Sequence, residues 1–172
     1  TTESLDELAV LAGIGKQVAA ITRRSMAGEL DFETALDERV AMLAGKPKEL
    51  IKQIIGSSKI AEGARILVQT MRANGAFCYL VSGGFDFLTG PIATECGFHG
   101  HHANHLDHDN TTITGTVRKP VLDCQAKVNY LKYYCQLHNV DQIATASVGD
   151  GANDLGMLKQ AGFGVAFHGK PI

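Results

Sequence analysis

The sequence predicts an α/β protein in which a parallel sheet packs between helices and follows an all-helical segment. Two apolar runs predict the sheet, AFCYLVSGG (residues 76–84) and QIATASVGDG (residues 142–151), because both end in glycines and helical patterns separate them. Residues 4–56 hold no such run and carry apolar residues at helical spacing. We therefore expect a helical domain over residues 1–57 and an α/β core over residues 58–172.

The composition favours a globular protein that acts on a small molecule. The chain has 172 residues, of which 45% are hydrophobic and 20% charged, so it can bury a core without disulfides. A net charge of -2 and the lack of a long apolar stretch argue against nucleic-acid and membrane partners. The cysteines are widely spaced without a CxxC pair, which favours reduced thiols in a cytoplasmic protein. They are Cys78, Cys96, Cys124 and Cys135.

Four helical patterns fill the N-terminal segment, and each stops at a glycine. Asp31 is placed as the N-cap of the third helix, and Pro47 belongs to the first turn of the fourth. The four terminating residues are Gly13, Gly28, Gly45 and Gly56.

The core alternates helices with strands. Helices are expected over residues 62–75, 85–97, 123–140 and 153–162, with Pro91 shortening or kinking the second and Asp123 capping the third. A short strand, FGVAF, follows at residues 163–167. The polar segment from His99 to Val117 suits a hairpin at the edge of the sheet.

The two predicted strand ends carry the residues best suited to phosphate and metal chemistry. Ser82 and Gly83 follow one strand, and Asp150, Asn153 and Asp154 follow the other. The carboxyl ends of parallel strands share one edge of a sheet, where glycine amides approach phosphates and carboxylates bind Mg²⁺. A plain β-turn with solvated aspartates is the alternative for the Gly-Asp-Gly segment.

Two positively charged residues, Lys127 and Arg39, lie at positions where a nearby anion would stabilise them. Lys127 falls about one turn into its helix, where it opposes the helix dipole unless an anion lies nearby, and a solvated surface lysine is the alternative. Arg39 lies within an apolar helical stripe, so it needs an anionic partner such as a substrate carboxylate, unless its side chain extends to the surface. The stripe consists of Phe32, Leu36, Val40 and Leu43.

Histidines crowd the segment HGHHANHLDH, which raises the question of a zinc site. The segment has no cysteine and no helical spacing to fix a ligand pair, so solvated histidines in a hairpin are the preferred interpretation. They are His99, His101, His102, His105 and His108.

The motifs VSGGFD, CQAK, GDGANDLGML and the closing GKP, together with ELDFETALDERVAMLAG in the helical segment, resemble the haloacid dehalogenase (HAD) superfamily and, within it, the phosphoserine phosphatases. The resemblance follows the family's order from Thr1 to Ile172. It implies a Rossmann-like three-layer core with an inserted helical cap, and hydrolysis of O-phospho-L-serine to L-serine and phosphate, the last step of serine biosynthesis.

The resemblance also implies roles for the phosphate-binding residues. Ser82 and the backbone of Gly83 would bond the phosphoryl group, and Lys127 would neutralise its charge. Asn153 would contact the substrate or its phosphate.

Metal and substrate residues follow from the same resemblance. Asp150 would ligate Mg²⁺, and Asp154 would support the metal shell. In the cap, Arg39 would bind the carboxylate of the serine moiety and Glu3 its amine.

One part of the family pattern is missing from this match. The family's nucleophile lies in an Asp-x-Asp motif at the end of a central strand just upstream of the cap, where it forms an aspartyl-phosphate. The resemblance begins after that strand, so we expect this chain alone to show little or no turnover. Two other interpretations stay open: another HAD phosphatase or phosphotransferase, and a non-catalytic homologue that binds a phosphorylated ligand or a metal.

Overall fold

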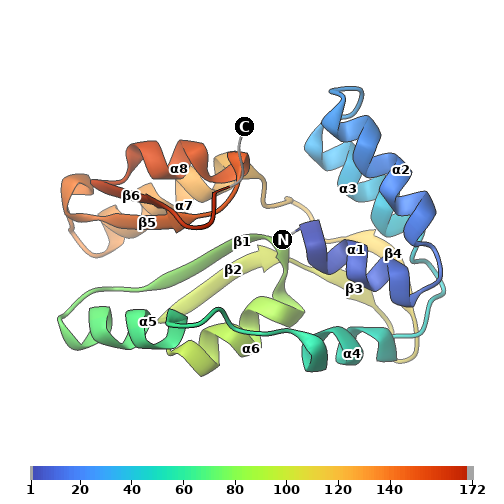
Figure 1. Cartoon of the computed structure of the whole chain (residues 1–172), viewed down its shortest axis with the longest axis horizontal. Helices are drawn as coiled ribbons and strands as arrows, with labels where there is room; N and C mark the ends of the chain where they lie inside the picture. Colours follow the sequence, from blue (N-terminus) through green and yellow to red (C-terminus); the bar gives the residue numbers. More distant parts are fainter. Residues whose placement is uncertain (1, 170–172) are drawn as a thin grey trace. The chain divides into compact units, whose positions relative to one another are not determined.

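The computed structural model describes residues 2–169, with side chains from Ser4 onward, and divides into two compact units (Figure 1). The first unit ends at Val121 and the second begins at Leu122. Each unit contains one parallel pair of strands with helices packed against it. The predicted α/β class with parallel strands is therefore confirmed.

The N-terminal segment is helical, as the glycine-terminated patterns predict. Asp31 caps the third helix, because its Oδ1 accepts a hydrogen bond from the Thr34 amide at 2.8 Å. Pro47 is not in the first turn of the fourth helix, because it forms a bridge with Thr112 and the helix starts two residues later. The helices are α1 (Thr2–Leu11), α2 (Gly15–Met26), α3 (Phe32–Ala41) and α4 (Glu49–Ser57).

A parallel strand pair follows the helical segment. Strand β1 (Tyr79–Phe85) pairs with β2 (Gly100–Asn104), and helices α5 (Ala64–Ala73) and α6 (Asp86–Cys96) lie along one face of the pair (Figure 1). The expectation of a hairpin starting at His99 is therefore wrong for residues 100–104. Their backbone continues the ladder of β1, which local polarity does not reveal.

Pro91 neither shortens nor ends helix α6, which continues to Cys96. A proline removes one backbone donor from a helix. Three side chains of α6 are buried, and their packing offsets that loss. They are Thr89, Ala93 and Cys96.

The hairpin itself is short and packs on the helical segment. Strands β3 (Leu106–His108) and β4 (Ile113–Val117) are antiparallel, and β4 contacts α3. Helices and strands thus share one hydrophobic cluster in the first unit. Its buried members are Leu5, Leu8, Leu36, Val40, Leu43, Ile51, Ile54, Phe85, Leu106, Ile113 and Val117.

The second unit repeats the strand and helix pattern. Asp123 caps α7 (Cys124–Leu137) by accepting a hydrogen bond from the Ala126 amide at 2.8 Å, as predicted. Strand β5 (Ala146–Gly149) pairs in parallel with β6 (Phe163–Ala166), and α8 (Leu155–Gln160) connects them. The short 3-10 turns Gln142–Ala144 and Ala152–Asp154 precede β5 and α8.

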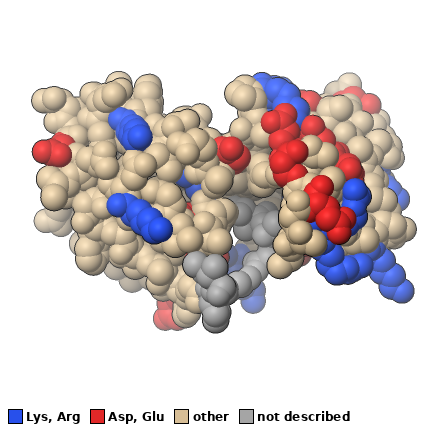
Figure 2. Space-filling view, turned by 90° about the horizontal axis from the view of Figure 1, so that it is seen from above, with Lys and Arg blue, Asp and Glu red and all other residues tan. Residues whose placement is uncertain are grey.

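The surface carries exposed large hydrophobic side chains, among them Met26, Ile66 and Ile143, as well as charged ones, and all four cysteines carry free thiols. Figure 2 shows acidic and basic side chains side by side on the helical part of the first unit. In the same unit, Lys119 Nζ lies 2.6 Å from Glu33 Oε1 and 2.7 Å from Asp37 Oδ2. Such exposed pairs stabilise a fold only weakly. Within residues 2–169, no helix has the length and apolar character needed to cross a bilayer.

Candidate functional site

Ser82 lies in a bulge of strand β1. The β1–β2 ladder runs from Tyr79 to Val81, breaks, and resumes only at Phe85. Ser82 is 7% exposed, and its Oγ accepts a hydrogen bond from the Gly84 amide at 3.1 Å. That bond occupies a lone pair and leaves the hydroxyl proton available for a phosphate oxygen.

Two residues hold this part of the chain: Asn104, which the sequence did not single out, and His105, which belongs to the histidine-rich segment. Asn104 Nδ2 donates to the Gly83 carbonyl at 2.8 Å, and His105 Nδ1 lies 2.5 Å from Asp86 Oδ2. No local sequence pattern predicts either contact, because both depend on how β2 and the residue after it are placed beside β1.

In the second unit, Lys127 forms a buried ion pair with Asp154. The Nζ–Oδ1 distance is 2.5 Å, and the side chains are only 5% and 6% exposed. The alternative of a solvated surface lysine is therefore wrong. The anion near Lys127 is a carboxylate of the chain itself, 27 residues away.

Asp154 also organises the loop that follows β5. Its Oδ2 accepts hydrogen bonds from the amides of Asp150 at 3.1 Å and Gly151 at 3.2 Å. Burial raises the pKa of the Asp154 carboxyl, but Lys127 and these two amides outweigh burial, and the pKa falls below its ordinary value. Asp154 is therefore ionised at neutral pH.

Asp150 and Asn153 lie in the same loop with exposed side chains. The Asp150 amide bonds to Asp154, whereas its carboxylate makes no hydrogen bond or ion pair with the described residues. The loop thus presents one carboxylate outward while another fixes its backbone. This arrangement differs from a plain solvated turn.

Arg39 is buried in the helical segment, at 4% exposure. Its Nε donates to the Ala35 carbonyl at 3.0 Å, and no carboxylate of the described residues forms an ion pair with it. Burial lowers the pKa of the guanidinium, and the charge of Asp6 partly offsets that effect. The guanidinium therefore keeps terminal N–H donors for a further anion.

Glu3, which we expect to bind a substrate amine, belongs to helix α1. Its side chain lies outside the described residues.

Comparison with known proteins identifies the family. Residues 2–159 match the family of haloacid dehalogenase-like hydrolases. The chain belongs to this family.

Individual relatives agree with that assignment. The chain is 41% identical over 170 residues to a phosphoserine phosphatase of Streptococcus thermophilus, covering 99% of this chain and 79% of the relative. It is 36% identical to a phosphoserine phosphatase of Archaeoglobus fulgidus, covering 99% of this chain and 49% of the relative. The crystal structure of a probable phosphoserine phosphatase from Vibrio cholerae, in unliganded form, superimposes with a TM-score of 0.92 at 37% identity, covering 99% of this chain and 53% of that one. The chain thus spans about half the length of two of these three proteins.

The donor set of this member of the HAD family fits Mg²⁺ better than a soft metal. Mg²⁺ takes oxygen ligands, often one or two carboxylates completed by water and substrate phosphate, and Asp150 offers such a carboxylate. In the described part of the chain, no group of three or more His, Cys, Asp or Glu side chains is arranged around a possible metal position. Water and phosphate would therefore have to complete the coordination.

Histidines of the segment HGHHANHLDH (residues 99–108) form contacts within the fold. His99 Nδ1 accepts from the Cys78 amide at 3.0 Å, and His101 Nδ1 lies 2.9 Å from Thr89 Oγ1. His108 Nδ1 lies 3.1 Å from the carbonyl of its neighbour Asp109. These contacts fix the rings within and beside β2 and β3.

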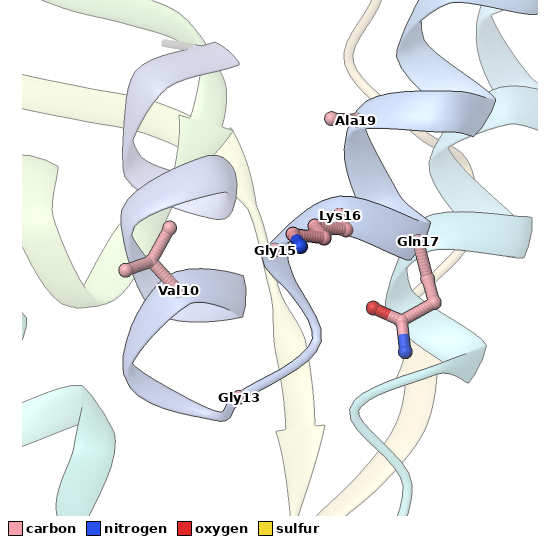
Figure 3. A pocket seen from close by; sticks show the side chains of 6 residues that line it. All are labelled: Val10, Gly13, Gly15, Lys16, Gln17 and Ala19. Carbon is pink, nitrogen blue, oxygen red and sulfur yellow. The ribbon is translucent and has the colours of Figure 1, made fainter.

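One surface hollow is lined by none of the residues assigned to the candidate site. It opens between α1 and α2, with a volume of about 540 Å³ (Figure 3). Its lining is mostly apolar and contains none of the predicted site residues. The lining residues are Val10, Gly13, Gly15, Lys16, Gln17 and Ala19.

Proposed function

We propose that this chain forms the cap and most of the core of a cytoplasmic, Mg²⁺-dependent phosphoserine phosphatase that converts O-phospho-L-serine to L-serine and phosphate. The buried guanidinium of Arg39, with terminal donors that no carboxylate of the described residues uses, carries the proposal. A substrate carboxylate would accept hydrogen bonds from these terminal donors of Arg39. The names of the relatives support this substrate class. The free thiols agree with a cytoplasmic protein.

In the first unit, the Ser82 hydroxyl and the Gly83 amide would bond a phosphoryl group. In the second unit, Lys127 and Asn153 would take the phosphate-contacting roles that the family resemblance implies. The bulge of β1 supports the first two roles, because it frees backbone groups and leaves the Ser82 proton unused. Lys127 would neutralise the phosphate charge while it stays paired with Asp154.

Mg²⁺, when bound, would neutralise charge on the phosphoryl oxygens. Asp150 would ligate it directly. Asp154 would support the metal site indirectly by holding the loop that carries Asp150, because Lys127 and two backbone amides already bind the Asp154 carboxylate oxygens. We assign the nucleophile to no residue of this chain, and little or no turnover by the chain alone stays our prediction.

The proposed substrate is tested by ligand binding, which needs no nucleophile. The probes are O-phospho-L-serine and O-phosphoethanolamine, which keeps the phosphate and amine but lacks the carboxylate. Calorimetric titration of Arg39→Gln should show about tenfold or greater loss of phosphoserine affinity, because a charge-assisted pair is lost. Phosphoethanolamine affinity should stay within about twofold of that of the unsubstituted chain.

Arg23→Gln is the matched control, since Arg23 is an exposed arginine on the neighbouring helix α2. Equal losses for both ligands, or equal losses in both variants, would assign Arg39 to folding rather than to the carboxylate. A chain that prefers phosphoethanolamine would favour another HAD phosphatase. Release of phosphate from phosphoserine, measured with the same samples, tests the prediction of little turnover.

A further inference from the structure

The bulge that carries Ser82 is held at two points by consecutive residues, Asn104 and His105. Between the paired positions Val81 and Phe85, strand β1 has three residues, whereas β2 has one between their partners His102 and Asn104. The two additional residues of β1 cannot join the ladder. Their backbone groups therefore need other partners to keep a single shape.

Asn104 supplies the first partner. Its side chain is 3% exposed, and Nδ2 donates to the Gly83 carbonyl at 2.8 Å. The bond fixes the peptide between Gly83 and Gly84, whose amide in turn bonds to the Ser82 hydroxyl. One buried amide group thus sets the orientation of the Ser82 side chain through a single peptide unit.

His105 holds the residue that follows the bulged segment, through a side-chain contact. Its Nδ1 lies 2.5 Å from Oδ2 of Asp86, the first residue of α6, and its Nε2 lies 3.9 Å from Asp107 Oδ1. Arg118 stands 3.7 Å from the same Asp107 oxygen. The imidazole therefore bridges the start of α6 to the hairpin, and Asp86 cannot shift without losing this contact.

We infer that Asn104 and His105 are positioning residues that hold Ser82–Asp86 in the shape that binds a phosphoryl group. Asn104 fixes the middle of this segment and His105 fixes its end, so both contacts act on Ser82 through backbone and neither touches the substrate. The inference rests on the proposed phosphate-binding role of Ser82 and Gly83. The inference adds Asn104 and His105 to the proposed phosphate-binding site, although neither belongs to the VSGGFD motif.

The test combines phosphate binding with local hydrogen exchange. The variants are Asn104→Leu, which keeps the size but removes the donor, His105→Ala, and His105→Gln, which restores a hydrogen-bond donor without an imidazole. His168→Ala is the matched control, because this exposed histidine belongs to the second unit and its ring contacts the neighbouring Phe167. Samples are compared at urea concentrations well below their unfolding midpoints, so that global unfolding does not contribute.

We expect amide exchange of residues 82–86 to rise at least about tenfold in Asn104→Leu and His105→Ala, since each loses one hydrogen bond. We monitor phosphate binding through the NMR signals of the same amides as inorganic phosphate is added. The affinity for phosphate should fall about tenfold in these two variants, and His105→Gln should regain most of the lost affinity. His168→Ala should match the unsubstituted chain in both measurements.

The two proposals fail in different ways. Unchanged exchange at residues 82–86 in Asn104→Leu and His105→Ala overturns the positioning role, whatever the phosphate affinity. Faster exchange with unchanged phosphate affinity overturns it as well. An unsubstituted chain that binds neither phosphate nor phosphoserine overturns the proposed function, and the exchange data then still decide whether the two residues hold the bulge.

Discussion

Lys127 Nζ lies 2.5 Å from Asp154 Oδ1, with both side chains almost completely buried. Each charge lowers the cost of burying the other, and Asp154 also receives two backbone amides from its own loop. The pair therefore connects helix α7 to the loop after β5 within the second unit. Removing one partner leaves the other charge buried without compensation.

Lys127→Met should lower the free energy of unfolding by about 3–5 kcal/mol, because it leaves the Asp154 carboxylate buried and unpaired. The double variant Lys127→Met/Asp154→Asn should lose less than the sum of the two single variants, because no charge is then left buried. Urea unfolding followed by near-UV circular dichroism of the tyrosines measures these differences.

Lys159→Met is the control, because Lys159 is an exposed lysine at the end of α8. Its unfolding free energy should change by no more than about 0.5 kcal/mol. Equal changes in the free energy of unfolding for the Lys127 and Lys159 substitutions would show that the buried ion pair does not stabilise the fold more than an exposed lysine does.

Stability should fall at acid pH through Asp154. Its folded pKa lies below the ordinary value of 3.8, so its contribution is complete above the unfolded pKa and is lost as the pH falls through the folded pKa. Urea unfolding between about pH 6 and pH 2 should show a smaller decline in Asp154→Asn than in the unsubstituted chain. Identical declines would exclude Asp154 as a source of the acid sensitivity.

Gly149→Ala should destabilise the loop after β5. A Cβ at residue 149 would overlap the Asp154 side chain and lie 2.7 Å from its Oδ2, so the buried carboxylate would have to move. We expect a loss of about 1–3 kcal/mol in urea unfolding. Gly56→Ala is the control, since nothing lies within 4 Å of its Cβ position, and it should be neutral or stabilising.

Gly115→Ala should disturb the packing of β4 on the end of α3. Gly115 has φ +87, and an added Cβ would lie 2.8 Å from the Cβ of Ala44. Gly28 has a similar φ of +78 with open space, so Gly28→Ala isolates the backbone strain of about 1–2 kcal/mol. The unfolding free energy of Gly115→Ala should fall by about 1–3 kcal/mol more than that of the control. Equal losses would rule out the steric contact.

Local chemistry explains which parts of the fold were predictable. Asp31 and Asp123 cap helices through amides three residues away, and such contacts are readable from sequence. The burial of Arg39 followed from its place on an apolar stripe. The edge segment at residues 100–104 was misassigned, because its pairing with β1 depends on residues some 20 positions away.

Local sequence patterns predict the helical segment, the two glycine-ended strands and the residue types suited to phosphate and Mg²⁺. Spacing along one helix or strand controls these features, and short-range hydrogen bonds and periodicity act within a few residues. Folding of the chain is what pairs Asp154 with Lys127 and places Asn104 and His105 beside the Ser82 segment. Those contacts join residues 19–27 positions apart. Burial and strand register select such partners, so local sequence patterns do not predict them.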